Sequence, residues 1–453
     1  MSPEAAARPA WRPGHGVPLT FLGTFAVVVA AGMAYLANEK PVYVLGITGL
    51  CVFLFFPRVC RLVFVGTIAI GPMFNPPVVG LGSGRVYVVQ ILMVCTFLGA
   101  ISVAARSGLH GPATQVLVLT VLLIGVETVG RADSGLAWVY RPLQVFFVAF
   151  TVVALFRHHA PRPLVLALAW GSTIGCTAAS VNALFPAFDP FRFSRPSDLP
   201  FVSAIGGFAR ATGAFTYPNN LGTYGAYAVI FGASAWLFGR PDLPRKLAVA
   251  VMASGASALL LAGSRAAGLG LTCAILYLTY RAAPGRRVVL IGAEVVVGLI
   301  VVTAVLSSPT AREITDQRVQ SATGISLTGR IDDWRGSLRE FRKSPLIGTG
   351  ASESRTDNFW LLYLAQAGAA GIVILAALAR VTFALHPGRA RELAPEMRAG
   401  LLLALCVSGL LQDSLGQTLT TWFLGALIGV ALLDPAPPAP EPAVADLLAA
   451  VGP

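Results

Sequence analysis

Long apolar segments alternate with short polar ones along almost the whole chain. Most of them approach the ~20 residues that a helix needs to cross a bilayer. They are continuous instead of alternating, which excludes the strands of a membrane barrel. We expect spans at 17–36, 41–56, 58–70, 85–104, 113–129, 137–156, 163–185, 218–239, 246–262, 265–281, 287–307, 357–383, 397–411 and 416–433. Because the second and third are short enough to merge or tilt, the pattern predicts about 12–14 transmembrane helices.

The positions of the basic residues orient these spans. Short cytoplasmic loops of membrane proteins carry an excess of Lys and Arg. Here one side receives Arg58 and Arg61, Arg106, Arg157 and Arg162, Arg240 with Arg245 and Lys246, Arg281 with Arg286 and Arg287, and Arg389 with Arg391 and Arg398. We place that side in the cytoplasm, together with a tail over 1–16 and a disordered Pro/Ala-rich tail over 434–453. The transmembrane domain then covers 17–433, with extracytoplasmic loops at 186–217 and 308–356.

Composition supports this class and narrows the chemistry. Of 453 residues, 55% are hydrophobic and 12% charged, against about 25% charged in soluble domains, and the mean hydropathy is +0.73. The net charge of +12 does not indicate nucleic-acid binding. The basic residues lie between the predicted helices instead of forming a patch with interleaved aromatic residues. The six cysteines lie in apolar segments without metal-ligand spacing, so we expect them to pack in the core. The expected fold class is an all-α polytopic membrane protein.

One polar, arginine-rich segment at 307–371 interrupts the apolar pattern. Three of its apolar residues recur at helical spacing: Trp334, Leu338 and Phe341. We predict a short helix over 331–343 that lies against the membrane domain and ends before Pro345. Asp332 and Asp333 would then lie near the positive end of its dipole. Arginine side chains bind phosphate oxygens through paired hydrogen bonds, so this extracytoplasmic segment indicates an anionic ligand.

Three arginines on the predicted extracytoplasmic side are candidates for holding that ligand. Arg210 lies shortly before the span at 218–239, Arg265 lies in a very short hairpin between two spans, and Arg330 precedes the predicted amphipathic helix. A single arginine at such a position can be an interfacial anchor. Several on one face favour an anion site, because charge held at membrane depth is costly and usually functional.

A fourth candidate lies where the span at 357–383 begins. Asp357 can cap that helix, as Asp does well, or act as a general base at the mouth of a membrane cavity. The two roles are compatible. Further along this span, the spacing of Gly368 and Gly371 predicts the close approach of another helix.

Four motifs follow one another in the second half of the chain: Arg210-x2-Gly-x-Phe-x2-Pro-Asn, Ser264-Arg265, Gly329-Arg330-x3-Trp with the later Pro345-Leu-Ile-Gly-Thr-Gly, and Asp357-Asn358-x9-Gly368-x2-Gly371. The last is similar to the His-Asn-x9-Gly-x2-Gly signature of the O-antigen ligase and O-antigen polymerase family. The others resemble the external loops of that family. The resemblance extends from about Arg210 to Gly371, with a weaker likeness from Gln412 to Gly429.

The resemblance implies a multi-pass glycosyltransferase of the bacterial inner membrane. Its donor would be a glycan on polyprenyl (undecaprenyl) diphosphate, and its acceptor a glycan or glycolipid outside the cytoplasm. Arg210, Arg265 and Arg330 would hold the diphosphate. The histidine of the family, which activates the acceptor hydroxyl, corresponds to Asp357, and an aspartate can also accept a proton from a sugar hydroxyl. We therefore predict Asp357 as the catalytic residue.

Further residues are expected to support the site: Asn358, Asn219, Trp334, Arg335, and the substitute acids Glu353 and Asp413. We expect no metal ion or other cofactor, because fixed arginines can neutralise the charge that develops on the diphosphate leaving group. Attack opposite that group would invert the anomeric carbon. Besides the bilayer and the two substrates, a chain-length regulator is the protein partner that such an enzyme could have.

Two other functions fit the same pattern of spans. A lipid-linked oligosaccharide flippase or other transporter predicts charged residues deep within several helices and an inverted repeat. Here the main acidic candidates inside spans are Glu127 and Glu294, and the arginines gather on the outer face instead. A catalytically inactive member of the family that acts as a scaffold would account for Asp357 in place of histidine. The sequence does not separate a ligase from a polymerase, because the two differ in the acceptor alone.

Overall fold

The computed structural model describes residues 57–75, 77–81, 84–107, 140–157, 159–191, 210–215, 217–239, 242–282, 284–285, 287–288, 291, 325–349, 358–383, 393–412 and 418–433. Within these ranges the protein has eleven helices and one small hairpin of two strands, so the expected all-α membrane class is confirmed. The helices are α3 (Pro57–Ile70), α4 (Val88–Ser107), α6 (Tyr140–Phe156), α7 (Arg162–Leu184), α8 (Pro218–Phe238), α9 (Arg245–Ala262), α10 (Arg265–Arg281), α13 (Ile325–Lys343), α14 (Phe359–Phe383), α15 (Leu393–Gly409) and α16 (Thr418–Leu432).

Four segments of the described helices are long and apolar enough to cross a membrane by their length and composition: Arg162–Leu184, Pro218–Phe238, Arg245–Ala262 and Phe359–Ala377. Three shorter helical segments are also apolar: Val88–Ala104, Gln144–Phe156 and Leu419–Leu432. The expected spans at 17–36, 41–56 and 113–129, and nearly all of 287–307, lie outside the described residues. The total of about 12–14 spans therefore stays a prediction.

The span predicted to begin at residue 85 begins instead at Val88, after a hairpin. Strand β1 (Pro77–Leu81) pairs antiparallel with β2 (Gly84–Tyr87). The Tyr87 N–H then donates to Gln90 Oε1 at 2.9 Å, at the start of α4. Valine-rich sequence suits a strand as well as an apolar helix, so hydropathy alone placed this boundary too early.

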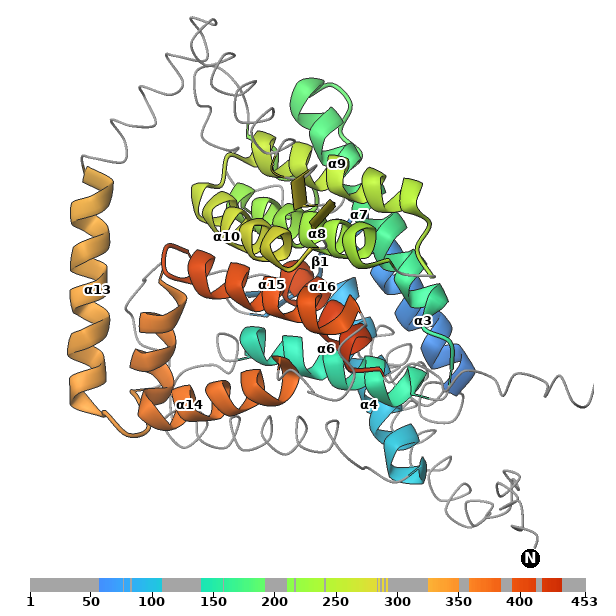
Figure 1. Ribbon diagram of the computed structural model, residues 1–453. Coiled ribbons are helices and arrows are strands. Elements are labelled where there is room, and N and C mark those ends of the chain that lie inside the picture. Colours follow the sequence, from blue (N-terminus) through green and yellow to red (C-terminus); the bar gives the residue numbers. More distant parts are fainter. Residues whose placement is uncertain are drawn as a thin grey trace, which may run out of the picture.

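Helix α8 forms the centre of the molecule, and nearly every residue from Leu221 to Leu237 is buried. Glycines bring its backbone against that of α9. An ideal Cβ on Gly225 would lie 2.6 Å from the Gly255 oxygen, and one on Gly255 would lie 2.7 Å from the Gly225 oxygen. Such small-residue contacts are typical of membrane helix pairs. Figure 1 shows α8, α9, α10 and α15 side by side, and α8 contacts the other three.

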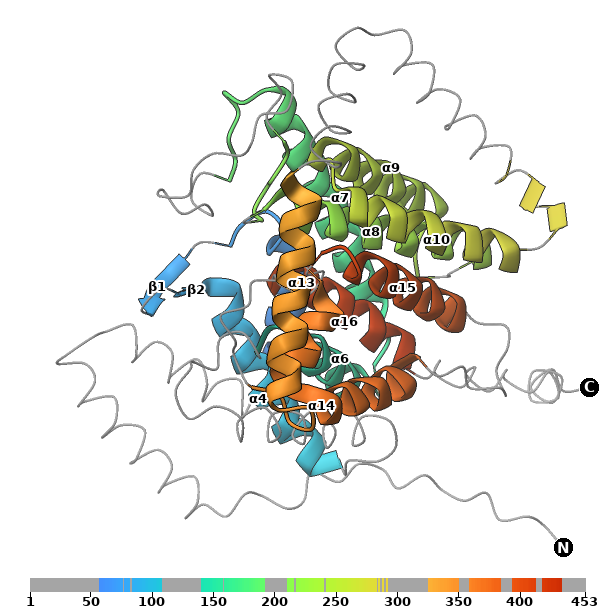
Figure 2. The same ribbon diagram turned by 90° about the vertical axis from the view of Figure 1, so that its left-hand side faces the viewer.

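Helix α13 lies at the edge of the molecule, where it crosses the direction of α8, α10 and α15 and contacts α14 (Figures 1 and 2). The predicted helix over 331–343 is confirmed, but it begins earlier, at Ile325. The predicted start followed the apolar spacing of Trp334, Leu338 and Phe341, which does not extend further back, whereas the helix continues through Gly329 at a cost of only about 1 kcal/mol relative to alanine. Asp332 and Asp333 therefore lie inside the helix, and the predicted interaction with its dipole is wrong.

Helix α14 is divided by Gly368, whose backbone angles (φ 64°, ψ −163°) are not helical. The close approach predicted at this glycine is present, but its partner is not a helix. An ideal Cβ on Gly368 would lie 2.5 Å from the backbone nitrogen of Gly348, which belongs to the turn that follows α13. The expectation of a helical partner is wrong at this position, because the sequence does not show that the turn returns to α14.

Candidate functional site

Arg210 is held where α9 ends and α8 begins. Its Nε donates to the Ala262 carbonyl at 2.7 Å, and its Nη2 donates to Asn219 Oδ1 at 2.9 Å. Ala262 is the last residue of α9, so the guanidinium lies at the negative end of that helix dipole, which stabilises a cation. These contacts orient the half-buried side chain. They also bring Arg210 to Asn219, which belongs to the same sequence motif.

The α9–α10 connection is as short as the sequence predicts. Gly263 adopts a left-handed conformation (φ 62°), and its N–H donates to Leu259 O at 3.0 Å and Leu260 O at 3.1 Å. Ser264 caps α10 by accepting a hydrogen bond from the Ala267 N–H at 3.4 Å. Arg265 is the first residue of α10 and is exposed. The positive end of the α10 dipole and the Arg265 side chain together favour an anion here.

Gln412 joins three helices at this end of the molecule. Its Oε1 accepts from the Ser264 hydroxyl at 3.1 Å, and its Nε2 donates to the Thr223 hydroxyl of α8. Thr223 in turn donates to the Asn219 carbonyl at 3.0 Å. Only 6% of Gln412 is exposed, so this side chain supports the site from within.

Asn358 attaches the start of α14 to the end of α15. Its Oδ1 accepts from the Leu361 N–H at 3.0 Å, which caps α14, and its Nδ2 donates to the Leu410 carbonyl at 3.0 Å. The capping role considered for Asp357 is thus performed by Asn358. Leu410 is two residues from Gln412. Hydrogen bonds, completed by this short piece of backbone, therefore form a chain of contacts from Arg210 through Asn219, Thr223 and Gln412 to Asn358.

The structure does not describe the side chains of four predicted site residues. Asp357, Glu353 and Asp413 lie outside the described residues, and Arg330 is described only as a backbone position in α13. Chain connectivity still limits two of the acids. Asp357 directly precedes Asn358, and Asp413 directly follows Gln412, so each lies one peptide unit, about 3.8 Å between Cα atoms, from a member of the contact chain.

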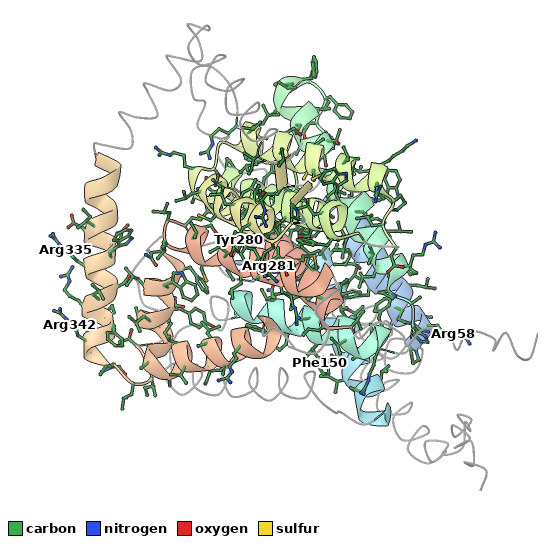
Figure 3. The ribbon with its side chains drawn as sticks, in the orientation of Figure 1. Arg58, Phe150, Tyr280, Arg281, Arg335 and Arg342 are labelled. Atoms are coloured by element: carbon green, nitrogen blue, oxygen red, sulfur yellow. The ribbon has the colours of Figure 1, made fainter. Side chains whose placement is uncertain are left out.

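The supporting residues on α13 are not brought to this cluster. Arg335 is 71% exposed and lies 3.4 Å from Asp332 on its own helix. Figure 3 shows the labelled Arg335 and Arg342 directed away from the body of the molecule. Trp334 is half-buried. Arg335 and Arg342 are therefore directed away from the part of the molecule that contains Arg210 and Arg265.

Sequence reasoning missed Gln412 and Thr223 as parts of the site. A signal for Gln412 was present, because it is a polar residue between two apolar spans and begins the weaker family likeness at the C-terminal end. Thr223 gave no signal, since a threonine inside an apolar helix commonly bonds to its own backbone. In the part of the chain that the structure describes, no group of three or more His, Cys, Asp or Glu side chains could hold a metal ion.

Residues 247–376 match the family model described as O-antigen ligase. The matched range contains Ser264 and Arg265, the α13 segment with Arg330, and the motif from Asp357 to Gly371, whereas Arg210 and Gln412 lie on either side of it. No curated protein matches the chain. The match agrees with the family resemblance that the motifs indicate, over this part of the chain.

Proposed function

We propose that this protein transfers a glycan from a polyprenyl diphosphate carrier to a glycan or glycolipid acceptor on the extracytoplasmic face of the bacterial inner membrane. The single observation that carries the proposal is the chain of contacts that joins Arg210 to Asn358 through Gln412. Together with the bonds to Ala262 and Ser264, this chain of contacts connects the ends of α8, α9, α10, α14 and α15. The family match supports an O-antigen ligase type of reaction in general terms.

The arginines act on the donor. Arg210, Arg265 and Arg330 together hold the diphosphate oxygens. The hydrogen bonds of Arg210 to Ala262 and Asn219 orient its guanidinium before the substrate arrives. A preorganised positive group needs no reorganisation as charge develops on the leaving group, which is the main advantage of a fixed electrostatic site.

The reaction follows from that arrangement. A hydroxyl of the acceptor attacks the anomeric carbon of the donor sugar, and the bond from that carbon to the diphosphate oxygen breaks. The electron pair leaves with the polyprenyl diphosphate, and Asp357 accepts the hydroxyl proton. Attack from the face opposite the leaving group inverts the anomeric carbon. Asn358, fixed on α15, holds the chain next to Asp357.

The test is transfer of glycan by purified protein in vesicles that contain the lipid-linked donor and an acceptor. We expect Arg210→Ala and Arg265→Ala to raise the KM for the donor by at least about tenfold, because a charge-assisted hydrogen bond contributes about 1.5–3 kcal/mol. Asp357→Asn should lower kcat by about 100-fold or more, in the range typical of a general base. The matched control is Arg245→Ala, an exposed arginine at the opposite end of α9.

The rival functions give different results in the same experiment. A transporter would move the lipid-linked donor across the vesicle membrane without extending or transferring its glycan. An inactive scaffold would transfer nothing and would tolerate Arg265→Ala in cells that depend on the protein for surface glycan. Wild-type kinetics in all three variants would overturn the assignment of the site.

A further inference from the structure

The break in α14 is filled by the turn that follows α13. A non-helical residue inside a helix leaves backbone groups without their usual partners, which is costly at membrane depth. Here the N–H groups of Ala369 and Ala370 donate to Pro345 O and Leu346 O, each at 2.9 Å. On the other side of the break, the Ala365 carbonyl accepts from the Thr349 N–H at 3.0 Å and from its hydroxyl at 3.3 Å. The turn therefore replaces bonds that the break removes.

Two glycines make this arrangement possible. Gly348 in the turn and Gly368 in the break both have positive φ, 72° and 64°, which residues with a side chain rarely adopt. Neither has room for a Cβ. On Gly368 it would lie 2.6 Å from the Leu346 carbonyl, and on Gly348 it would meet the backbone of Gln366. Backbone on both sides cannot move away independently, so an alanine at either position separates the turn from the break.

The segment above the break reaches the candidate site. Phe359–Ala367 is nine residues of helix, or about 13 Å at 1.5 Å per residue, and a rotation of about 10° at its base would move its far end by about 2 Å. That end carries Asn358 and is attached to α15 through Leu410 and through the Trp360 Nε1, which donates to Cys406 O at 3.2 Å. In Figure 1 this half of α14 runs along α13, and the second half turns away.

We infer that the turn at 345–349 and the break at Gly368 form a lock that sets the direction of the first half of α14, and so the position of Asn358 relative to Arg210 and Arg265. Gly348, Gly368 and Thr349 are positioning residues for the reaction, and they do not touch the substrates. This inference rests on the proposed function. A displacement of about 1 Å at a reacting group can cost on the order of 100-fold in rate.

The experiment compares Gly348→Ala and Gly368→Ala with Gly336→Ala, a glycine of α13 with no neighbouring atom within 4 Å of an added Cβ. In donor transfer by reconstituted protein we expect the first two to lower kcat at least about tenfold, with the donor KM within about twofold because the arginines stay in place. Gly336→Ala should match the wild type. A loss that affects KM alone, or unchanged kcat in Gly368→Ala, would overturn the inference.

A milder pair of variants applies if the glycine variants do not accumulate in the membrane. Thr349→Val removes only the hydroxyl bond to Ala365, and we expect kcat to fall about threefold, as the loss of one modest hydrogen bond predicts. Thr349→Ser keeps the hydroxyl and should restore the rate. Equal rates in the two variants would count against the lock.

Crosslinking tests the lock without any activity. Cysteines at Leu346 and Ala370, in a chain whose native cysteines are replaced, should be joined by a short bifunctional reagent in wild-type and Gly336→Ala protein and much less in Gly368→Ala. If the wild-type protein crosslinks normally but transfers no glycan, the proposed function is overturned and the lock stands. If the wild type transfers glycan, and Gly368→Ala keeps both full crosslinking and full kcat, the lock is overturned and the proposed function stands.

Discussion

The hydroxyl of Ser264 donates to Oε1 of Gln412 at 3.1 Å and joins the start of α10 to the end of α15. The other ends of the same two helices are joined by Arg281 and Glu396, whose closest atoms are 2.7 Å apart. This antiparallel pair is thus attached at both ends, by a neutral hydrogen bond beside the candidate site and by an ion pair away from it. The two attachments therefore have different expected effects on activity.

Replacing Gln412 by methionine should lower both stability and activity. The side chain keeps its length, but the Ser264 hydroxyl loses the acceptor that it now has in a buried setting, which costs about 1–3 kcal/mol. We expect a lower unfolding temperature in detergent and a reduced kcat for glycan transfer. The control is Thr272→Val, an exposed hydroxyl of α10 that bonds to the carbonyl of Gly268 in its own helix. Equal effects of the two substitutions would contradict the bridging role of Gln412.

Substitutions of Asn358 separate its two contacts. Asn358→Ser can still cap α14, since serine is among the preferred capping residues, but it is too short to reach the Leu410 carbonyl. Asn358→Ala loses both contacts and should be about 1 kcal/mol less stable than the serine variant. We expect both variants to transfer glycan more slowly than wild type, measured as kcat per folded molecule. Full activity in Asn358→Ser would show that the contact with α15 does not matter for the reaction.

Helix boundaries in the centre of the molecule followed from local chemistry. The spans expected at 163–185, 218–239, 246–262 and 265–281 differ from α7, α8, α9 and α10 by one residue at most. Pro218 begins α8 at a position where a missing N–H costs nothing, and Gly263 and Ser264 end one helix and cap the next. These residues determine helix ends through neighbours a few positions away, so the helix ends can be predicted from the sequence alone.

The contacts that build the site could not be predicted in the same way. Gln412 lies 148 residues from Ser264 and 189 from Thr223, and nothing local specifies those partners. The spacing of Gly368 and Gly371 is typical of glycines at a helix interface. The positive φ of Gly368, however, belongs to its contact with the turn at 345–349. The three arginines were found because charge is rare in this chain, yet only the structure shows that Arg210 is attached to Asn219 and the end of α9.

A double-mutant cycle tests whether Asn219 acts through Arg210. Asn219 Oδ1 accepts from Arg210 Nη2 at 2.9 Å, so Asn219→Ala should leave the guanidinium less well oriented and raise the donor KM moderately. Adding Asn219→Ala to Arg210→Ala should then cause little further loss, with a coupling energy of about 0.5–3 kcal/mol, as for residues in contact. The measurement is the donor KM of all four proteins under one set of conditions. Independent, additive effects would mean that Asn219 contributes in some other way.

Glu396 provides the contrast at the opposite end of α10 and α15. Its Oε1 accepts from Arg281 Nη2 at 2.7 Å and from Arg281 Nε at 3.0 Å. Its Oε2 accepts from the same Nε at 3.1 Å and from the Tyr277 hydroxyl at 2.9 Å. Hydrogen bonds to charged groups contribute about 1.5–3 kcal/mol, and because half of the Arg281 side chain is exposed we expect a loss of about 1–2 kcal/mol in Glu396→Ala.

The variant should unfold at a lower temperature in detergent, while each folded molecule keeps its kcat and its donor KM. Glu396→Gln keeps one oxygen that can accept from Arg281 and gains an amide N–H that can donate to the Tyr277 hydroxyl, so it should lose less stability than Glu396→Ala. Reduced kcat at unchanged stability would show instead that this end of the helix pair is coupled to the candidate site. The two attachments are separated by the length of α10, seventeen residues from Arg265 to Arg281. This is about 24 Å along the helix, which favours independence.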